Sequence, residues 1–273
     1  MKIYQLTNTT AYQMMGYVIH TSDNKVIVID GGNIGQSEEL YSTLKKTSLN
    51  VDLWFLTHLH NDHYESIIEI FENHPDVMVK SFWRNRNDDI MDILSPEEQN
   101  EAIKWYDFEK RFDTHILYSP KINDKARVGS VCVEILGVSN PEITQNNLNN
   151  QSMVIKLTED DFSVLFLGDL GIEGGEKLLE LQGEKVCSDA VQMAHHGQGG
   201  VNRKVYEAIG AKYAFWPTPK WLWDNTKYLG KGNPGDGIFQ TPEVIKWSQE
   251  LGMTNITSFE KTQVFDTKAK NAV

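Results

Sequence analysis

Three histidines and an aspartate fall within six consecutive positions of this chain. The run Thr57-His58-Leu59-His60-Asn61-Asp62-His63 holds three of the eight histidines in 273 residues. Neutral imidazole and carboxylate groups are strong ligands for divalent metals. Residues two apart in an extended segment share a side, so His58 and His60 can reach one metal ion. Asp62 and His63 lie past the turn, where they can reach a second point close by.

Two later segments carry the same residue types directly after apolar runs. Asp169 follows the run 164–167, and His195 with His196 follows the run 189–194. We expect each run to be a buried strand, and α/β folds place chemistry beyond the carboxyl ends of strands. An aspartate at this place can simply cap a turn, but the cluster at 58–63 favours a carboxylate that bridges two metals.

The paired histidines are expected to do different jobs, because adjacent side chains diverge. One would coordinate a metal. The other would lie over the open coordination position, as a proton donor or as a hydrogen bond to a substrate oxygen. We assign His196 to the metal and His195 to catalysis.

Six residues therefore form the candidate ligand set: His58, His60, Asp62, His63, Asp169 and His196. Structural zinc sites prefer four cysteines or histidines with no open position, so this set indicates a hydrolytic centre. Two metals about 3.5–4 Å apart would activate a bridging water and clamp the attacking and leaving oxygens. Mixed imidazole and carboxylate ligands suit one or two divalent ions, with zinc favoured and manganese or iron also compatible.

The segments between these motifs predict alternating strands and helices. We expect strands or hairpins over 16–32, 51–57, 128–136, 153–167, 189–194 and 213–216, and helices over 37–46, 64–73, 95–113, 176–181, 201–209 and 241–251. The order is strand-rich, α/β, strand-rich and α/β again. It favours two packed sheets flanked by helices in a single domain over residues 1–273.

Charge and composition limit the partners. The formal net charge of −12 does not attract polyanions, so long DNA or RNA is disfavoured and a small-molecule substrate is expected. No apolar run approaches the roughly 20 residues that span a bilayer, and residues 1–7 lack the layout of a signal peptide. Cys132 and Cys187 are interpreted as reduced core thiols. These features predict a cytoplasmic protein with no membrane partner.

With these motifs in order, the chain resembles the metallo-β-lactamase fold superfamily. The resemblance rests on Asp30-Gly31-Gly32, on the run 57–63, on Gly168-Asp169-Leu170 and on His195-His196-Gly197, and it covers about residues 10 to 265. It implies an α/β fold, the αβ/βα four-layer sandwich of two mixed sheets flanked by helices, with the site at one sheet edge.

Within the superfamily, the segment Asn149-Asn150-Gln151-Ser152 and the His-His-Gly motif look most like one subgroup. That subgroup includes the hydrolase domain of competence DNA-uptake proteins and the phosphorylcholine esterases, which implies phosphodiester or phosphonoester-like cleavage. The sequence departs from the family where a histidine usually precedes the strand that leads to the bridging aspartate. That position falls near Asn149, Asn150 or Ser152, and no histidine follows His196. Asn150 is a candidate for a metal or substrate contact, as is Ser152 for substrate.

Aromatic residues gather after the last predicted strand. Trp216, Trp221 and Trp223 fall within eight residues. They can be core aromatics beneath a long loop. Alternatively, Trp221 and Trp223 form an aromatic wall beside the metals that binds a ring, a sugar face or a quaternary ammonium. The sequence does not choose between these interpretations.

The leading hypothesis is a metal-dependent hydrolase that cleaves a phosphoester. Asp62 would orient the nucleophilic water and take its proton, His195 would protonate the leaving oxygen, and the metals would stabilise the developing charge. An alternative keeps the site and changes the substrate to a lactone, thioester or amide. A second alternative is a metal-binding protein without turnover.

Overall fold

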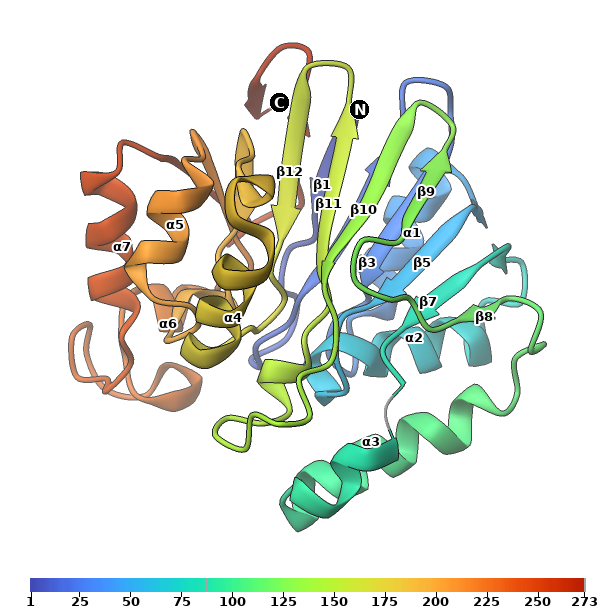
Figure 1. The fold of residues 1–273 in the computed structure, drawn as a ribbon, viewed down its shortest axis with the longest axis horizontal. Coiled ribbons are helices and arrows are strands. Elements are labelled where there is room, and N and C mark those ends of the chain that lie inside the picture. Colours follow the sequence, from blue (N-terminus) through green and yellow to red (C-terminus); the bar gives the residue numbers. More distant parts are fainter. Residues whose placement is uncertain (87, 273) are drawn as a thin grey trace.

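Two β-sheets pack face to face and carry helices on their outer faces in the computed structural model, which describes residues 1–86 and 88–272 (Figure 1). The first sheet has the order β17-β16-β1-β2-β3-β5-β7-β8 and the second β15-β14-β13-β12-β11-β10-β9. Both sheets are mixed, because antiparallel strands near one edge give way to parallel ones. This is the four-layer arrangement expected from the sequence, and the expected fold class is confirmed.

The strands are short and regularly placed. The first sheet contains β1 (Lys2–Gln5), β2 (Gly16–His20), β3 (Val26–Asp30), β5 (Leu53–Leu56), β7 (Phe82–Arg84), β8 (Leu117–Tyr118), β16 (Gln263–Asp266) and β17 (Asn271–Ala272). The second contains β9 (Lys125–Val128), β10 (Val131–Gly137), β11 (Val154–Glu159), β12 (Phe162–Phe166), β13 (Ala190–Gln192), β14 (Tyr213–Trp216) and β15 (Thr254–Thr257). A separate two-stranded pair joins β4 (Asn50–Val51) to β6 (Met78–Val79).

Seven α-helices lie in the described part of the chain. They are α1 (Ser37–Thr47), α2 (Asn61–Asn73), α3 (Pro96–Glu109), α4 (Ile172–Gln182), α5 (Arg203–Ile209), α6 (Lys220–Trp223) and α7 (Thr241–Glu250). The first three accompany the first sheet and the last four accompany the second (Figure 1). None of the helices among the described residues is long and apolar enough to cross a membrane.

Strand β3 shows how the sequence produces these layers. Its residues Val26-Ile27-Val28-Ile29 are all fully buried. Successive side chains of a strand point to opposite faces. Ile27 and Ile29 accordingly enter the core between the sheets, and Val26 and Val28 pack toward the helices. A strand buried on both faces has a continuous apolar run.

Several boundaries differ from the sequence-based expectation. Helix α2 begins at Asn61 rather than at residue 64, so Asp62 and His63 lie in its first turn. The expected strand over 128–136 is a hairpin of β9 and β10, because Gly129 has a φ of +56° and turns the chain. The expected helix over 95–113 ends at Glu109, although Ser95 caps its start through a capping box.

Candidate metal centre

The loop from β5 to α2 presents the first four candidate ligands. Strand β5 ends at Leu56, His58 and His60 occupy the loop, and Asp62 and His63 begin α2. The loop between β3 and α1 is held against this turn, because the Gly31 N–H donates to the His63 carbonyl at 2.8 Å. A Cβ at Gly31 would lie 2.6 Å from the Ile67 side chain, so only glycine allows this close approach.

The second sheet supplies the remaining ligands from two adjacent parallel strands. Asp169 follows β12, and its N–H donates to Ser152 Oγ at 2.9 Å. His195 and His196 follow β13 with φ values of +51° and +52°. Left-handed backbone at non-glycine residues is strained and concentrates at functional sites. This strained turn directs the two imidazoles in different directions.

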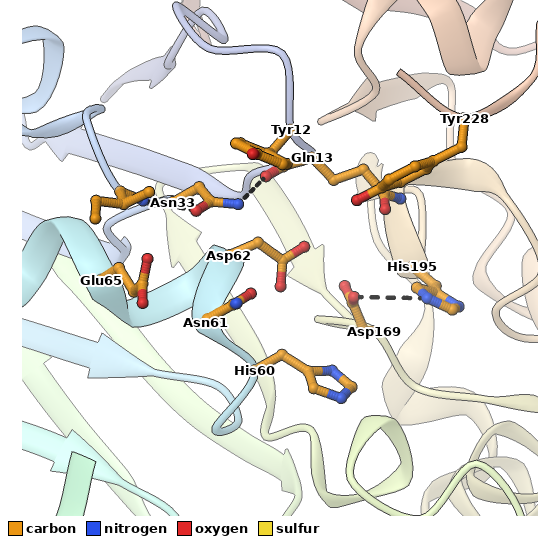
Figure 2. Close-up of a pocket in the computed structure, with 11 residues that line it drawn as sticks. Tyr12, Gln13, Asn33, His60, Asn61, Asp62, Glu65, Asp169, His195 and Tyr228 are labelled. Carbon is orange, nitrogen blue, oxygen red and sulfur yellow. Dashed lines mark hydrogen bonds and ion pairs between the residues drawn. The ribbon is translucent and has the colours of Figure 1, made fainter. Parts of the chain in front are cut away.

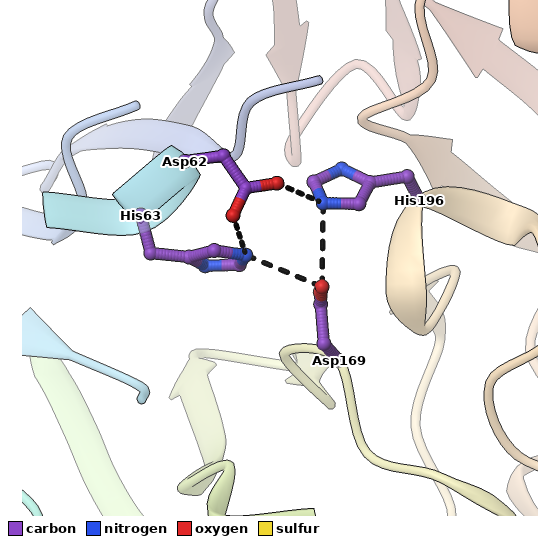
Figure 3. A group of neighbouring side chains, drawn as sticks. All are labelled: Asp62, His63, Asp169 and His196. Carbon is purple, nitrogen blue, oxygen red and sulfur yellow. Dashed lines mark ion pairs between the residues drawn. The ribbon is translucent and has the colours of Figure 1, made fainter. Parts of the chain in front are cut away.

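Four side chains converge on one point, as Figure 3 shows: Asp62, His63, Asp169 and His196. His196 Nε2 lies 3.1 Å from Asp62 Oδ2 and 3.3 Å from Asp169 Oδ2. His63 Nε2 lies 3.3 Å from Asp169 Oδ2 and 3.8 Å from Asp62 Oδ1. Three distant segments of the chain therefore bring two imidazole nitrogens and two carboxylates together.

A second group shares Asp169 with the first. It consists of His58, His60 and Asp169. His58 Nε2 lies 3.0 Å from His60 Nδ1 and 4.0 Å from Asp169 Oδ2. Burial lowers the pKa of both His58 and His60, so both imidazoles are neutral at neutral pH and can offer a lone pair.

Hydrogen bonds behind the ligands fix which imidazole nitrogen faces the centre. His63 Nδ1 lies 2.7 Å from Oδ2 of the fully buried Asp30, and His196 Nδ1 lies 2.8 Å from the Pro217 carbonyl. These acceptors keep a proton on Nδ1, so Nε2 is the nitrogen of each ring that faces the centre and can give up its own proton to a cation. Such outer partners orient the ligands of metal sites.

The first group has the electrostatics of a cation site. Burial alone would lower the pKa of His196, but Asp169 and Asp62 raise it to about 10. Burial also opposes the charged form of Asp169, yet His196 and His63 hold the pKa of its carboxyl well below the usual value. The group therefore attracts positive charge, either as protons on the imidazoles or as a divalent cation in their place.

The donor set fits a divalent metal. Nε2 of His63, Nε2 of His196 and Oδ1 of Asp169 are buried and have no hydrogen-bond partner. Tetrahedral ligands at about 2.0–2.1 Å from an ion lie roughly 3.3–3.4 Å from one another. The measured separations of 3.1, 3.3, 3.3 and 3.8 Å lie around that value. A bound cation would satisfy the unpartnered atoms together.

A cavity of about 500 Å³ opens directly beside these groups. His60, Asp62, Asp169 and His195 are among the residues that line it, and Tyr12 and Tyr228 lie across it from His60 (Figure 2). The other lining residues are Gln13, Asn33, Ile34, Asn61 and Glu65. A small polar substrate can thus reach the metal centre.

One protein-family model matches the part of the chain that contains the first four candidate ligands. Residues 12–132 match the family model of the metallo-beta-lactamase superfamily. The match covers less than half of the chain, and the fold of the whole chain is the metallo-beta-lactamase fold. No curated protein matches the sequence. The centre described above is thus a His/Asp cluster suited to divalent metal in a chain with this fold.

Two solved structures share the superfamily fold over nearly the whole chain. The metallo-beta-lactamase fold protein YhfI from Bacillus subtilis is 11% identical with a TM-score of 0.58, and the match covers 97% of this chain and 99% of that one. A mutant of the CmlA beta-hydroxylase is 12% identical with a TM-score of 0.56, and the match covers 97% of this chain and 53% of that one. At these identities the likeness shows the fold and leaves the substrate open.

The side chains of His195 and His196 lie in different places. His196 joins Asp62, His63 and Asp169. It is the last histidine of the sequence, so this group takes no ligand from a later histidine. His195 belongs to neither ligand group and lines the cavity, with its Nε2 4.0 Å from Asp169 Oδ2.

Four residues were expected to contact the substrate, and none of them is among the described residues that line the cavity of about 500 Å³. They are Asn150, Ser152, Trp221 and Trp223. The buried Asn150 accepts from the N–H groups of Gly171 and Gly174 near the start of α4. Ser152 is buried and holds Asp169 through its N–H, as described above. Trp221 packs against Tyr228 and Phe239, and Trp223 packs against Trp216 and Phe259. The structure thus gives these four side chains supporting contacts within the protein.

Sequence reasoning missed the residues that actually face the cavity from other loops. Tyr12, Gln13 and Asn33 come from the loops around β2 and β3, and Tyr228 comes from the glycine-rich loop after α6. Asn149, rather than Asn150, lies beside His195, with its Nδ2 3.4 Å from His195 Nε2. The weak signal for Tyr228 is its place in a glycine-rich loop, because loops often carry binding residues.

Proposed function

We propose that this protein is a metal-dependent hydrolase that cleaves a phosphoester, with a phosphodiester as the favoured bond. The observation that carries the proposal is the sharing of Asp169 by two ligand groups at the wall of an open cavity. Bound divalent cations would supply Lewis acidity, which stabilises charge on the ester oxygens and makes a water more acidic. Zinc is the favoured ion because imidazoles dominate the donor set.

The chain's own residues would handle the proton and orient the substrate. Asp62 lines the cavity and can hold the attacking water and accept its proton. Burial lowers the pKa of His195, so its imidazole is neutral at neutral pH. We therefore favour His195 as a hydrogen-bond donor to the leaving oxygen over a fully protonated acid.

The cavity lining supports a small substrate with little negative charge beyond the reacting group. Glu65 adds a carboxylate to those of Asp62 and Asp169, and the described residues that line the cavity include no lysine or arginine. A polyanion would meet carboxylates there, which argues against long nucleic acid as the substrate. The neutral donors Gln13, Asn33 and Asn61 can bind uncharged polar groups.

A substrate panel on the metal-loaded protein tests the proposal. Because the CmlA beta-hydroxylase has the same fold, fold alone does not select hydrolysis. We expect turnover of bis-p-nitrophenyl phosphate without added reductant, in excess over p-nitrophenyl esters and lactones. His195→Ala should lower kcat about 10²-fold, whereas His115→Ala, an exposed histidine outside the centre, should not.

The proposal has clear points of failure. Faster turnover of lactones or carboxylic esters than of phosphodiesters would overturn the choice of substrate and keep a hydrolase. Full metal occupancy with no turnover of any ester would instead support a metal-binding protein. Activity that survives both thorough chelation and Asp62→Ala would contradict the mechanism altogether.

A further inference from the structure

We propose that this protein has a second ligand site, away from the metal centre, that binds a neutral sugar or a related polyol. The site is a cavity of about 430 Å³, here called the second cavity, lined by residues of the loop after β1, of α6 and the loop that follows it, and of the loop after β15. Its volume lies within the range of about 300–1,000 Å³ that small-molecule sites have. The inference goes beyond the proposed hydrolase and does not depend on it.

The second cavity is separate from the metal cavity, the one of about 500 Å³ beside the ligands. Within the described part of the chain, the two cavities share no lining residue. Trp221 lines the second cavity and Tyr228 lines the metal cavity, and their rings meet edge to face with centroids 5.4 Å apart. Trp221 Nε1 also donates to the Ala11 carbonyl at 3.0 Å, which ties α6 to the loop after β1. The tryptophan that the sequence suggested as a wall beside the metals thus lines a different cavity.

The charged groups of the second cavity cancel one another. Lys220 and Asp224 are the charged residues among the described residues that line it. The Lys220 ammonium pairs with both carboxylate oxygens of Asp224. An ionic ligand would have to compete with this pair, whereas a neutral ligand would not. The cavity therefore favours an uncharged ligand over the quaternary ammonium considered from the sequence.

The hydroxyl groups in the lining are available as hydrogen-bond acceptors. The Thr218 hydroxyl donates to the His196 carbonyl at 2.6 Å, and the Ser258 hydroxyl donates to the Leu6 carbonyl at 2.9 Å. The Thr226 hydroxyl donates to a backbone carbonyl of α6 at 3.0 Å. A hydroxyl that donates its one proton inside the protein can still accept through its lone pairs. A ligand that matches such walls is rich in O–H donors, as a sugar or polyol is.

Two aromatic side chains, Trp221 and Phe259, form the apolar part of the lining. Trp221 is half-buried and is held by Tyr228 and Phe239, whose ring centroids lie 5.4 and 5.6 Å from its own. Phe259 is held by Trp223, with ring centroids 5.5 Å apart. Side chains fixed before binding lose little conformational freedom when a ligand arrives. The C–H face of a sugar ring is apolar, so it can pack on these rings while its hydroxyls reach the acceptors.

Titration of the zinc-loaded full chain with the methyl glycosides of glucose, galactose and mannose tests the inference. Binding is measured by calorimetry, and saturation-transfer NMR shows which glycoside protons contact the protein. We expect at least one glycoside to bind at one molecule per chain, with the strongest transfer to its ring C–H protons. Trp221→Ala should weaken this binding at least about 10-fold. Phe259→Ala should do the same, and it serves as the second variant if Trp221→Ala does not fold.

Tyr12→Ala is the matched control, because Tyr12 is an aromatic residue that lines the metal cavity and not the second one. This variant should bind the glycoside as the wild type does. Loss of binding in Tyr12→Ala, with wild-type binding in Phe259→Ala, would place the sugar in the metal cavity and overturn the inference. Absence of binding by all three glycosides would overturn it as well. A glycoside bound as expected to a protein that turns over no ester would support the second site and overturn the hydrolase alone.

Discussion

Substitution of Asp30 by asparagine should weaken metal binding without removing a single ligand. Asp30 is fully buried, and its Oδ2 accepts from the Thr57 hydroxyl at 2.8 Å and from His63 Nδ1 at 2.7 Å. Its Oδ1 accepts from the Thr57 N–H at 2.7 Å. An amide presents only one oxygen, so Asp30→Asn sets an NH₂ group against at least one of these donors.

The expected loss follows from these contacts. A buried donor left without an acceptor costs about 1–3 kcal/mol of stability. If the NH₂ group faces His63, the imidazole must move its proton to Nε2, the atom that points at Asp62 and Asp169. Loss of such a partner weakens metal affinity by about 10- to 100-fold, or about 1.4–2.7 kcal/mol.

Competition titration with a chromogenic chelator measures this effect. Asp52→Asn is the matched control, because Asp52 accepts from the Val26 N–H at 3.0 Å at the opposite end of β3. We expect Zn²⁺ affinity to fall in Asp30→Asn alone, and excess Zn²⁺ to restore activity. Wild-type affinity in Asp30→Asn would refute the claim that Asp30 fixes the His63 tautomer.

Three further changes test other contacts. Ser152→Ala removes the acceptor of the Asp169 N–H, so Zn²⁺ should bind more weakly in the same titration; wild-type affinity would contradict the claim that Ser152 positions Asp169. Gly197→Ala places a Cβ against the buried Trp216 ring at a φ of +74° and should lower the free energy of unfolding by about 2–4 kcal/mol, measured by urea denaturation. Burial, with nearby carboxylates, raises the pKa of Glu101 from 4.5 to about 7, so its contribution to stability is full below pH 4.5 and is lost as pH rises through about 7. Glu101→Gln should therefore gain about 1–2 kcal/mol over wild type at pH 8 relative to pH 5, a figure reduced because the side chain is partly exposed; an equal difference at both pH values would show that Glu101 has an ordinary pKa.

Local patterns were sufficient to predict the elements that carry the ligands. The apolar run before Thr57 predicted the strand that became β5, and the runs before Asp169 and His195 predicted β12 and β13. A strand buried on both faces has a continuous run of apolar residues. The change from apolar residues to histidines therefore marks the end of the strand. Sequence alone could therefore place the ligands at strand ends, where α/β folds gather them.

The residues that line the cavity beside the ligands could not be predicted in the same way. Nothing near Tyr12 or Tyr228 in the sequence indicates that both face His60, because their meeting depends on how the two sheets pack. Likewise, the carboxamide of Asn150 is occupied by the N–H groups of Gly171 and Gly174, which only the folded chain brings to it. Buried amides need partners wherever the fold supplies them.

The start of α2 shows a further limit of periodicity. Apolar spacing predicted a helix from residue 64, whereas the helix begins at Asn61 with Asp62 in its first turn. The first residues of α2 are polar because they lie at the metal centre rather than against the core. They therefore do not contribute to the apolar spacing from which the helix was predicted. A carboxylate there is favoured by the helix dipole.

Anomalous diffraction from crystals grown with Zn²⁺ tests the central claim most directly. A peak is expected within bonding distance of Asp62, His63, Asp169 and His196, and a second peak is expected beside His58 and His60. Zinc bound only elsewhere on the protein, with Asp169 and His196 free of it, would contradict the account of this centre.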